Sequence, residues 1–120
     1  MKILICDDNA ESVTDIHNLL DKYTNKNSLS FDIKEFFGGD ELIKSQAFFD
    51  IAFVDIEMPK TNGLTLTKHL KNVNPNIIIF IVTSFNGYLD DAMDLNVFRY
   101  LSKPISSERF EKGLDTAIRL

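Results

Sequence analysis

Residues 77–82 read Ile-Ile-Ile-Phe-Ile-Val, the longest uninterrupted apolar run in the chain. The run has no polar face, a pattern typical of a strand in a parallel sheet that helices cover on both sides. It is far shorter than the roughly 20 apolar residues that cross a membrane as a helix. The run therefore predicts a buried strand, and we expect that strand to form the middle of a parallel sheet.

Shorter apolar runs and helical patterns alternate on either side of this strand. Further apolar runs predict strands at residues 3–6, 51–54 and 97–101, and a weaker alternating strand begins at residues 31–33. Apolar residues at helical spacing predict helices within residues 13–23, 42–47, 66–73, 88–95 and 110–118. Strands that alternate with helices through short loops indicate an α/β fold of three layers with right-handed crossovers.

Length and composition set limits on the kind of protein. A chain of 120 residues is the size of one domain, and its 44% apolar and 26% charged residues are typical of a folded globular protein. The net charge of −5 argues against direct binding to nucleic acid. The single cysteine, Cys6, excludes an internal disulfide framework, and we expect it to be buried. We find no signal-peptide pattern and expect a cytoplasmic location.

Two pairs of adjacent phenylalanines, Phe36-Phe37 and Phe48-Phe49, occur in the chain. Adjacent side chains on a regular strand point to opposite faces, so we expect one ring of each pair to be exposed. His17 and His69 fall within predicted helices, and we expect both at the surface.

Polar residues follow four of the five predicted strands. Asp7 and Asp8 come after the first strand, Asp55 after the third, Thr83 after the fourth and Lys103 after the fifth. In an open parallel sheet, ligands bind just beyond the carboxyl ends of the strands. We therefore expect these side chains to meet on one rim of the sheet.

Three carboxylates on one rim repel one another. Two unit charges 4 Å apart cost about 4 kcal/mol at an effective dielectric near 20, so a cation is needed. Mg²⁺ suits the site because it accepts carboxylates, keeps waters and binds phosphate oxygens, and Lys103 supplies a second positive charge. A carboxylate in this setting can attack phosphorus, while the Thr83 hydroxyl can donate to a phosphoryl oxygen. The layout predicts the capture of a phosphoryl group.

Each of these residues also has an ordinary structural explanation. Asp8 or Asn9 can cap the first helix, Thr83 can be a turn residue and Lys103 can be a solvated surface charge. These explanations are adequate for one residue at a time. They explain much less well why an acid pair, a single acid, a hydroxyl and a lysine follow four strands in this order.

The whole chain resembles the receiver domains of bacterial two-component response regulators. Four motifs carry the resemblance: Asp7-Asp8, Asp55-Ile56-Glu57-Met58-Pro59 with Gly63, Thr83-Ser84, and Tyr100-Leu101-Ser102-Lys103-Pro104. Each motif alone is weak, whereas the set is highly specific. The resemblance implies a flavodoxin-like fold with a doubly wound, five-stranded parallel sheet in the order 2-1-3-4-5, and a receiver domain that covers residues 1–120.

The resemblance also implies which residues take part in phosphorylation. Asp55 would accept a phosphoryl group from a histidine kinase. Asp7, Asp8, Asp55 and the backbone carbonyl of Glu57 would hold Mg²⁺, the one cofactor that the resemblance implies. Glu57 also occupies a position that in the family tunes how long the phosphoryl group lasts.

A second set of residues would respond to the phosphoryl group. The resemblance implies that Thr83 and Lys103 contact the phosphate and that Tyr100 turns inward together with Thr83. It implies a cis bond between Lys103 and Pro104, consistent with cis bonds being essentially a proline feature. Phe85, like Glu57, would affect the phosphoryl lifetime.

The expected partners follow from the same resemblance. One is a sensor histidine kinase. The other is a second copy of the chain or an output domain, which would bind to the surface formed by the fourth helix, fifth strand and fifth helix. Residues 83–101 resemble the regulators that carry a LytTR-type DNA-binding domain. Any output domain would lie outside this chain, and DNA would be bound only through it, with regulation of transcription as the result. No membrane partner is expected.

Other functions remain open at this point. The site also suits a Mg²⁺-dependent aspartyl-phosphate phosphatase or phosphotransferase, although a haloacid dehalogenase would need an Asp-x-Asp arrangement and a cap domain. A flavodoxin-like cofactor carrier would need a phosphate-binding loop where Asp7 and Asp8 stand. A stand-alone receiver that acts by protein contact is a further alternative. We favour a signalling switch over a turnover enzyme.

Overall fold

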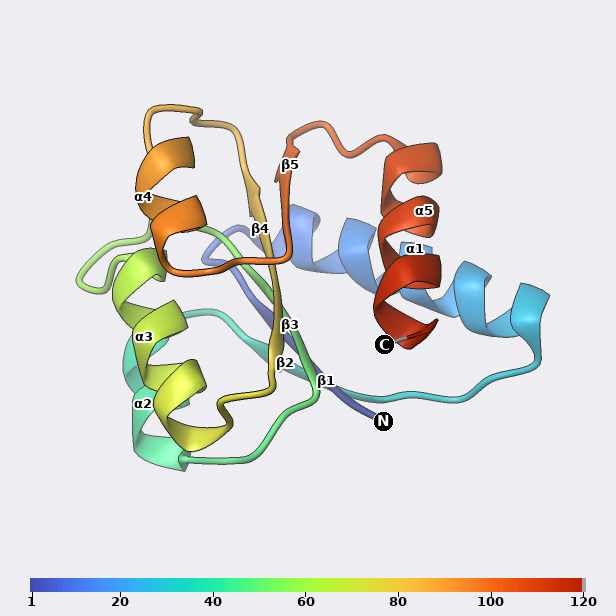
Figure 1. Cartoon of the computed structure of the whole chain (residues 1–120), viewed down its shortest axis with the longest axis horizontal. Coiled ribbons are helices and arrows are strands. Elements are labelled where there is room, and N and C mark those ends of the chain that lie inside the picture. The colour runs from blue at the N-terminus through green and yellow to red at the C-terminus, as the bar shows by residue number, and fades with distance from the viewer. Residues whose placement is uncertain (120) are drawn as a thin grey trace.

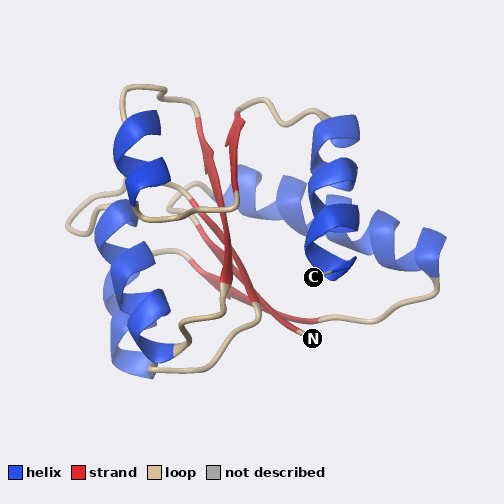
Figure 2. Cartoon of the chain, in the orientation of Figure 1, coloured by secondary structure: helices blue, strands red, loops and turns tan. Residues whose placement is uncertain are grey.

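Strands and helices alternate along the computed structural model, which describes residues 1–119 (Figures 1 and 2). The strands are β1 Lys2–Cys6, β2 Asp32–Phe36, β3 Ile51–Val54, β4 Ile78–Thr83 and β5 Arg99–Ser102. The helices are α1 Ala10–Asn27, α2 Gly39–Ser45, α3 Gly63–Val73, α4 Leu89–Asp94 and α5 Ser107–Arg119. The alternation predicted from the sequence is confirmed.

The strands form one parallel sheet in the order β2-β1-β3-β4-β5, as the resemblance implied. The expectation that residues 77–82 form the middle strand is wrong. They supply most of β4, which lies between β3 and the edge strand β5, and β3 is the middle strand. An uninterrupted apolar run reports burial on both faces. Every interior strand has that burial, so the run does not fix a strand's place in the sheet.

Helices cover both faces of the sheet, with α1 and α5 on one side and α2, α3 and α4 on the other (Figures 1 and 2). Successive strand residues point to opposite faces, so β1 sends Ile3 and Ile5 into the core beneath α1 and α5 and sends Leu4 and Cys6 into the other. The first core contains a stack of three rings: the centroid of Phe53 lies 4.7 Å from that of Phe80 and 5.2 Å from that of Phe110.

Helix caps define where the rim loops end. The Asn9 side chain accepts hydrogen bonds from the backbone N–H groups of Glu11 and Ser12, so Asn9, not Asp8, caps α1. Asn62 caps α3 through the N–H of Leu64. Because the cap is Asn9, both acids of the preceding pair remain available to the rim.

The two phenylalanine pairs and Cys6 agree with the sequence predictions, whereas His17 and His69, expected at the surface, are half-buried. Phe49 is buried and Phe48 is 54% exposed, while Phe36 is half-buried and Phe37 is 50% exposed. Cys6 is fully buried, and burial together with the nearby Asp7 raises the pKa of its thiol to about 12. Within residues 1–119, no helix has both the length and the apolar character needed to cross a membrane.

Candidate functional site

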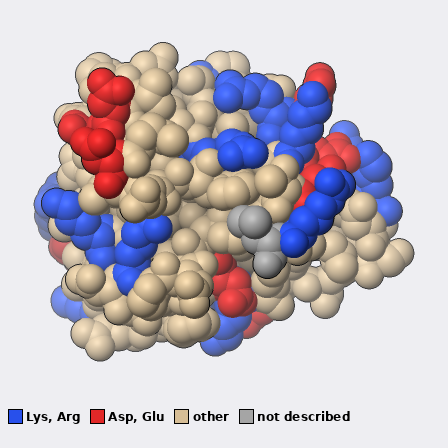
Figure 3. Space-filling model, viewed as in Figure 1, with Lys and Arg blue, Asp and Glu red and all other residues tan. Residues whose placement is uncertain are grey.

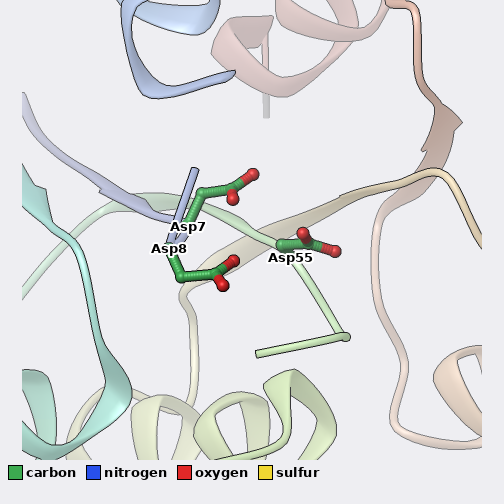
Figure 4. Close-up of side chains that lie close together, drawn as sticks. All are labelled: Asp7, Asp8 and Asp55. Carbon is green, nitrogen blue, oxygen red and sulfur yellow. The ribbon is translucent and has the colours of Figure 1, made fainter. Parts of the chain in front are cut away.

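Three carboxylates meet at the carboxyl ends of β1 and β3. Asp7 and Asp8 follow β1, and Asp55 follows β3, its neighbour in the sheet, with Cys6 paired to Val54. Each side chain offers one carboxylate oxygen, and these oxygens lie within 4.8 Å of one another (Figure 4). Asp7 and Asp55 are buried, whereas Asp8 is exposed. The convergence that the strand ends predicted is therefore present.

Lys103 joins two of these acids. Its ammonium nitrogen Nζ lies 2.7 Å from Asp7 Oδ2 and 3.0 Å from Asp55 Oδ2, and its side chain is 19% exposed. The Lys103 backbone N–H donates to the Thr83 carbonyl, which continues the β4–β5 ladder past its last pair. The bond from Lys103 to Pro104 is cis, as the resemblance implied.

Burial and ion pairing determine the charges at the rim. Burial raises the pKa of Asp7, although hydrogen bonds from Lys103 and from the Asn9 N–H act to lower it. Burial acts to lower the pKa of Lys103, but its hydrogen bonds to Asp7 and Asp55 outweigh this effect and raise it. Lys103 therefore stays charged. One ammonium does not neutralise three carboxylates, so the rim keeps a net negative charge that suits a hard cation such as Mg²⁺.

The loop after β3 is folded back onto Asp55. The Glu57 N–H donates to Asp55 Oδ1 at 3.3 Å, and the Gly63 N–H donates to the Ile56 carbonyl at 2.9 Å. A Cβ atom at Gly63 would lie only 2.1 Å from the Asp55 carbonyl oxygen. The start of α3 can approach the end of β3 this closely only because residue 63 is glycine.

Thr83 and Tyr100 lie beside the carboxylates without bonding to them. The Thr83 hydroxyl accepts a hydrogen bond from the Phe85 N–H at 3.4 Å, and residues 1–119 show no hydrogen bond from this hydroxyl to the rim carboxylates. Tyr100 is half-buried, and its hydroxyl donates to the Phe85 carbonyl. Burial, followed by the charge of Asp55, raises the pKa of Tyr100. Both side chains therefore contact the loop between β4 and α4.

Two contacts near the rim were not predicted from the sequence. The Ser102 hydroxyl donates to the Asn86 side chain at 3.1 Å, and the Thr61 hydroxyl donates to Asp40 at 2.9 Å. The parallel register, which pairs Thr83 with Ser102, indicates that Ser102 lies close to the loop that follows Thr83. The Thr61 contact joins two loops and leaves no periodic signal in the sequence.

The model of the response regulator receiver domain matches residues 3–115 of the chain. The chain belongs to this family. As a receiver domain of two-component response regulators, it carries its acidic cluster at the carboxyl edge of the receiver sheet.

Curated relatives of this receiver domain are regulators. The chain is 34% identical over 81 residues to the sensory transduction protein LytT of Oceanobacillus iheyensis, covering 64% of this chain and 33% of the relative. It is 26% identical over 126 residues to the sensory transduction protein LytR of Streptococcus agalactiae, covering all of this chain and 49% of the relative. Both names agree with the LytTR resemblance of residues 83–101. The receiver domain spans less than half the length of these relatives.

Solved structures support the same fold. The REC domain of AraT, a response regulator from Geobacillus stearothermophilus, aligns with a TM-score of 0.83 at 29% identity over 97% of this chain and 91% of that chain. A response regulator receiver domain protein from Clostridium thermocellum aligns with a TM-score of 0.79 at 25% identity over 98% of this chain and 94% of that chain.

Proposed function

We propose that this receiver domain accepts a phosphoryl group on Asp55 from a sensor histidine kinase and transmits the change to an output or dimer surface. The observation that carries the proposal is the position of Lys103, whose ammonium bridges Asp55 and Asp7 within a cluster of three carboxylates. A fixed cation beside an acidic cluster of this kind suits a reaction in which a further anionic group must be bound.

The rim residues suit a magnesium ion. Asp7, Asp8 and Asp55 would hold Mg²⁺ together with the backbone carbonyl of Glu57, a set of hard oxygen ligands. When bound, Mg²⁺ offsets negative charge on the phosphoryl oxygens and on the acids. The exposed position of Asp8 leaves the cluster open to solvent on one side.

The chemical step is a displacement at phosphorus. A carboxylate oxygen of Asp55 attacks the phosphorus of a phosphohistidine, and an O–P bond forms as the N–P bond breaks. The N–P electron pair stays on the imidazole nitrogen, which takes up a proton and leaves as neutral histidine. Lys103 holds a positive charge at Asp55 Oδ2, and the Thr83 hydroxyl donates to a phosphoryl oxygen. The product is an acyl phosphate on Asp55.

The same contacts provide a route from the rim to the surface. A Thr83 hydroxyl that turns toward the phosphoryl group gives up its bond to the Phe85 N–H, and Tyr100, whose hydroxyl donates to the Phe85 carbonyl, turns inward with it. The loop between β4 and α4 then shifts, and α4, β5 and α5 move with it. This surface exposes Phe85, Leu89 and Met93. Figure 3 shows acidic side chains over α4 and a mixture of basic and acidic ones over α5.

The partners follow from this surface. We propose that it binds a second copy or an output domain outside residues 1–120, and that DNA is bound through that output domain. The curated relatives, which are longer than this chain and are named as regulators, support an output in transcription.

The experiment is phosphorylation of the purified chain with Mg²⁺ and acetyl phosphate, followed by intact-mass measurement. We expect one phosphoryl group on the wild type and on Asp90→Asn, an exposed acid of α4, and none on Asp55→Asn. Absence of uptake by the wild type, or equal uptake by Asp55→Asn, would contradict the proposal. Catalytic hydrolysis of added phosphoesters would instead indicate the phosphatase alternative.

A further inference from the structure

A side-chain hydrogen bond joins the loop between β3 and α3 to α2. The proposed phosphoryl transfer does not itself involve this bond. The Thr61 hydroxyl donates to Asp40 Oδ1 at 2.9 Å, which joins this loop to the first turn of α2. Thr61 is 8% exposed and Asp40 is exposed, so the bond is shielded from competing water on the Thr61 side. A hydrogen bond in such surroundings selects a conformation more strongly than one at an open surface.

The backbone of α2 fits closely around Thr61. A Cβ atom at Gly39 would lie 2.6 Å from Thr61 Cβ and 2.8 Å from Thr61 Cγ2, so only glycine permits this approach. Gly39 is buried and immediately precedes Asp40. The close packing therefore places the Asp40 carboxylate directly opposite the Thr61 hydroxyl.

The loop needs contacts with other parts of the chain to stabilise it, because its own backbone is strained. Lys60 has a φ of 69°, in the left-handed region that side chains with a Cβ rarely adopt. The Thr61 N–H donates to the Pro59 carbonyl, which closes a tight turn around Lys60. Strained turns of this kind persist where surrounding contacts fix them.

Apart from the Asn62 cap on the adjoining helix α3, few side-chain hydrogen bonds connect residues 55–62 to other parts of the described chain. They are the bond from Lys103 to Asp55, the contact of 4.0 Å between Cys6 Sγ and Met58 Sδ, and the bond from Thr61 to Asp40. A thiol and a thioether make a weak pair. Beyond Asp55 and the Asn62 cap, Thr61 therefore makes the strongest side-chain hydrogen bond from this loop to the rest of the described chain.

We infer that Thr61 is a positioning residue: by bonding Asp40, it fixes the loop that presents the Glu57 backbone and the Asp55 carboxylate to Mg²⁺. The inference rests on the proposed function, because Glu57 and Asp55 are metal ligands there. Loss of the Thr61 hydroxyl lets the loop leave the conformation in which the Glu57 N–H reaches Asp55 Oδ1. Mg²⁺ must then restore that conformation as it binds, and its affinity falls.

The test compares the Mg²⁺ dependence of acetyl phosphate labelling in matched variants. Thr61→Val keeps the side-chain shape and removes the donor, and Asp40→Ala removes the acceptor. We expect each to raise the half-saturating Mg²⁺ concentration by about three- to tenfold, which corresponds to one hydrogen bond. The double variant should show no larger shift than either single variant, because both remove the same bond.

Two further variants separate the hydrogen bond from charge and from folding. Thr61→Ser keeps the donor and should stay within about twofold of the wild type, as should Glu41→Ala, which removes the neighbouring exposed acid of α2. The rate at saturating Mg²⁺ should be nearly unchanged in all variants. A Thr61→Val variant with wild-type Mg²⁺ dependence overturns the inference, and so does an equal shift in Glu41→Ala.

A direct Mg²⁺ titration distinguishes failure of this inference from failure of the proposed function. Amide resonances of residues 55–58 and 60–62 report metal binding without any phosphoryl transfer. If the wild type takes up no phosphoryl group, the proposed function fails, and the titration alone decides the role of Thr61. Equal Mg²⁺ affinities of the wild type and Thr61→Val in that titration overturn the inference even where phosphorylation succeeds.

Discussion

At the scale of single residues, Lys103 sets the electrostatics of the rim. Its ammonium contacts two carboxylates that are each less than a tenth exposed, so water solvates those charges poorly. Removing one partner of a buried ion pair leaves the other charge unpaired, which typically costs 3–5 kcal/mol. Here two acids depend on the same cation.

Lys103→Met should therefore destabilise the Mg²⁺-free protein by about 3 kcal/mol, the lower end of that range because Lys103 is partly exposed. Mg²⁺ should recover part of the loss, since it supplies positive charge to the same acids. Urea unfolding with and without Mg²⁺ measures both effects. Lys112→Met is the control, because Lys112 makes only an exposed contact with Glu108, and it should change stability little. Equal losses of stability in both variants would show that the Lys103 ion pairs contribute no more to stability than an exposed ion pair does.

The residues of the rim differ in how far the sequence predicts them. Asp7, Asp55 and Lys103 come directly after strands, and parallel strands end at one edge, so their meeting follows from the order of elements. The contact between Thr61 and Asp40 joins two loops, where no periodic pattern relates position in sequence to position in space. Only the folded chain brings that pair together.

At the scale of elements, the connection from β3 to α3 depends on Gly63. An added Cβ would lie 2.1 Å from the Asp55 carbonyl oxygen and 2.7 Å from the Ile56 Cα. Both contacts are with backbone atoms, which cannot rotate away from the added Cβ as the end of a flexible side chain can. The start of α3 would have to move away from the residue proposed to receive the phosphoryl group.

Gly63→Ala should destabilise the chain by about 1–3 kcal/mol, the usual cost of overpacking, and should slow phosphorylation of Asp55. Gly38→Ala is the matched control, because a Cβ there meets nothing within 4 Å. It should lose less stability and should be phosphorylated at the wild-type rate. Thermal unfolding and labelling by acetyl phosphate measure the two effects. If Gly63→Ala were as stable and as reactive as Gly38→Ala, the close approach would not constrain the loop.

The order of elements could be predicted more exactly than their ends. The apolar run at residues 51–54 matches β3 because that strand is buried throughout. The alternating pattern at residues 31–33 predicts where β2 begins, and the strand spans Asp32–Phe36. Its end was not evident, because an edge strand with mostly exposed side chains shows little apolar pattern. Periodicity records burial, and it weakens wherever an element is half exposed.

At the scale of the whole molecule, part of the net charge of −5 is concentrated at one place. Folding brings one carboxylate oxygen each of Asp7, Asp8 and Asp55 within 4.8 Å of one another, and Lys103 pairs with two of these acids. Unfolding separates Asp55 from the adjacent pair Asp7-Asp8 and relieves that part of the repulsion. A cation that binds the folded rim and not the unfolded chain must therefore stabilise the fold.

Mg²⁺ at 100 times its dissociation constant should add about 2.7 kcal/mol to the free energy of unfolding. For a domain of this size, that corresponds to a rise in Tm of roughly 10 °C. Asp8→Asn should lose at least half of the rise, yet it should cost little without Mg²⁺, because Asp8 is exposed. Thermal unfolding at matched ionic strength, with KCl in place of MgCl₂, separates specific binding from screening. If KCl gave the same rise, or if Asp8→Asn kept it in full, the three acids would not act as one cation site.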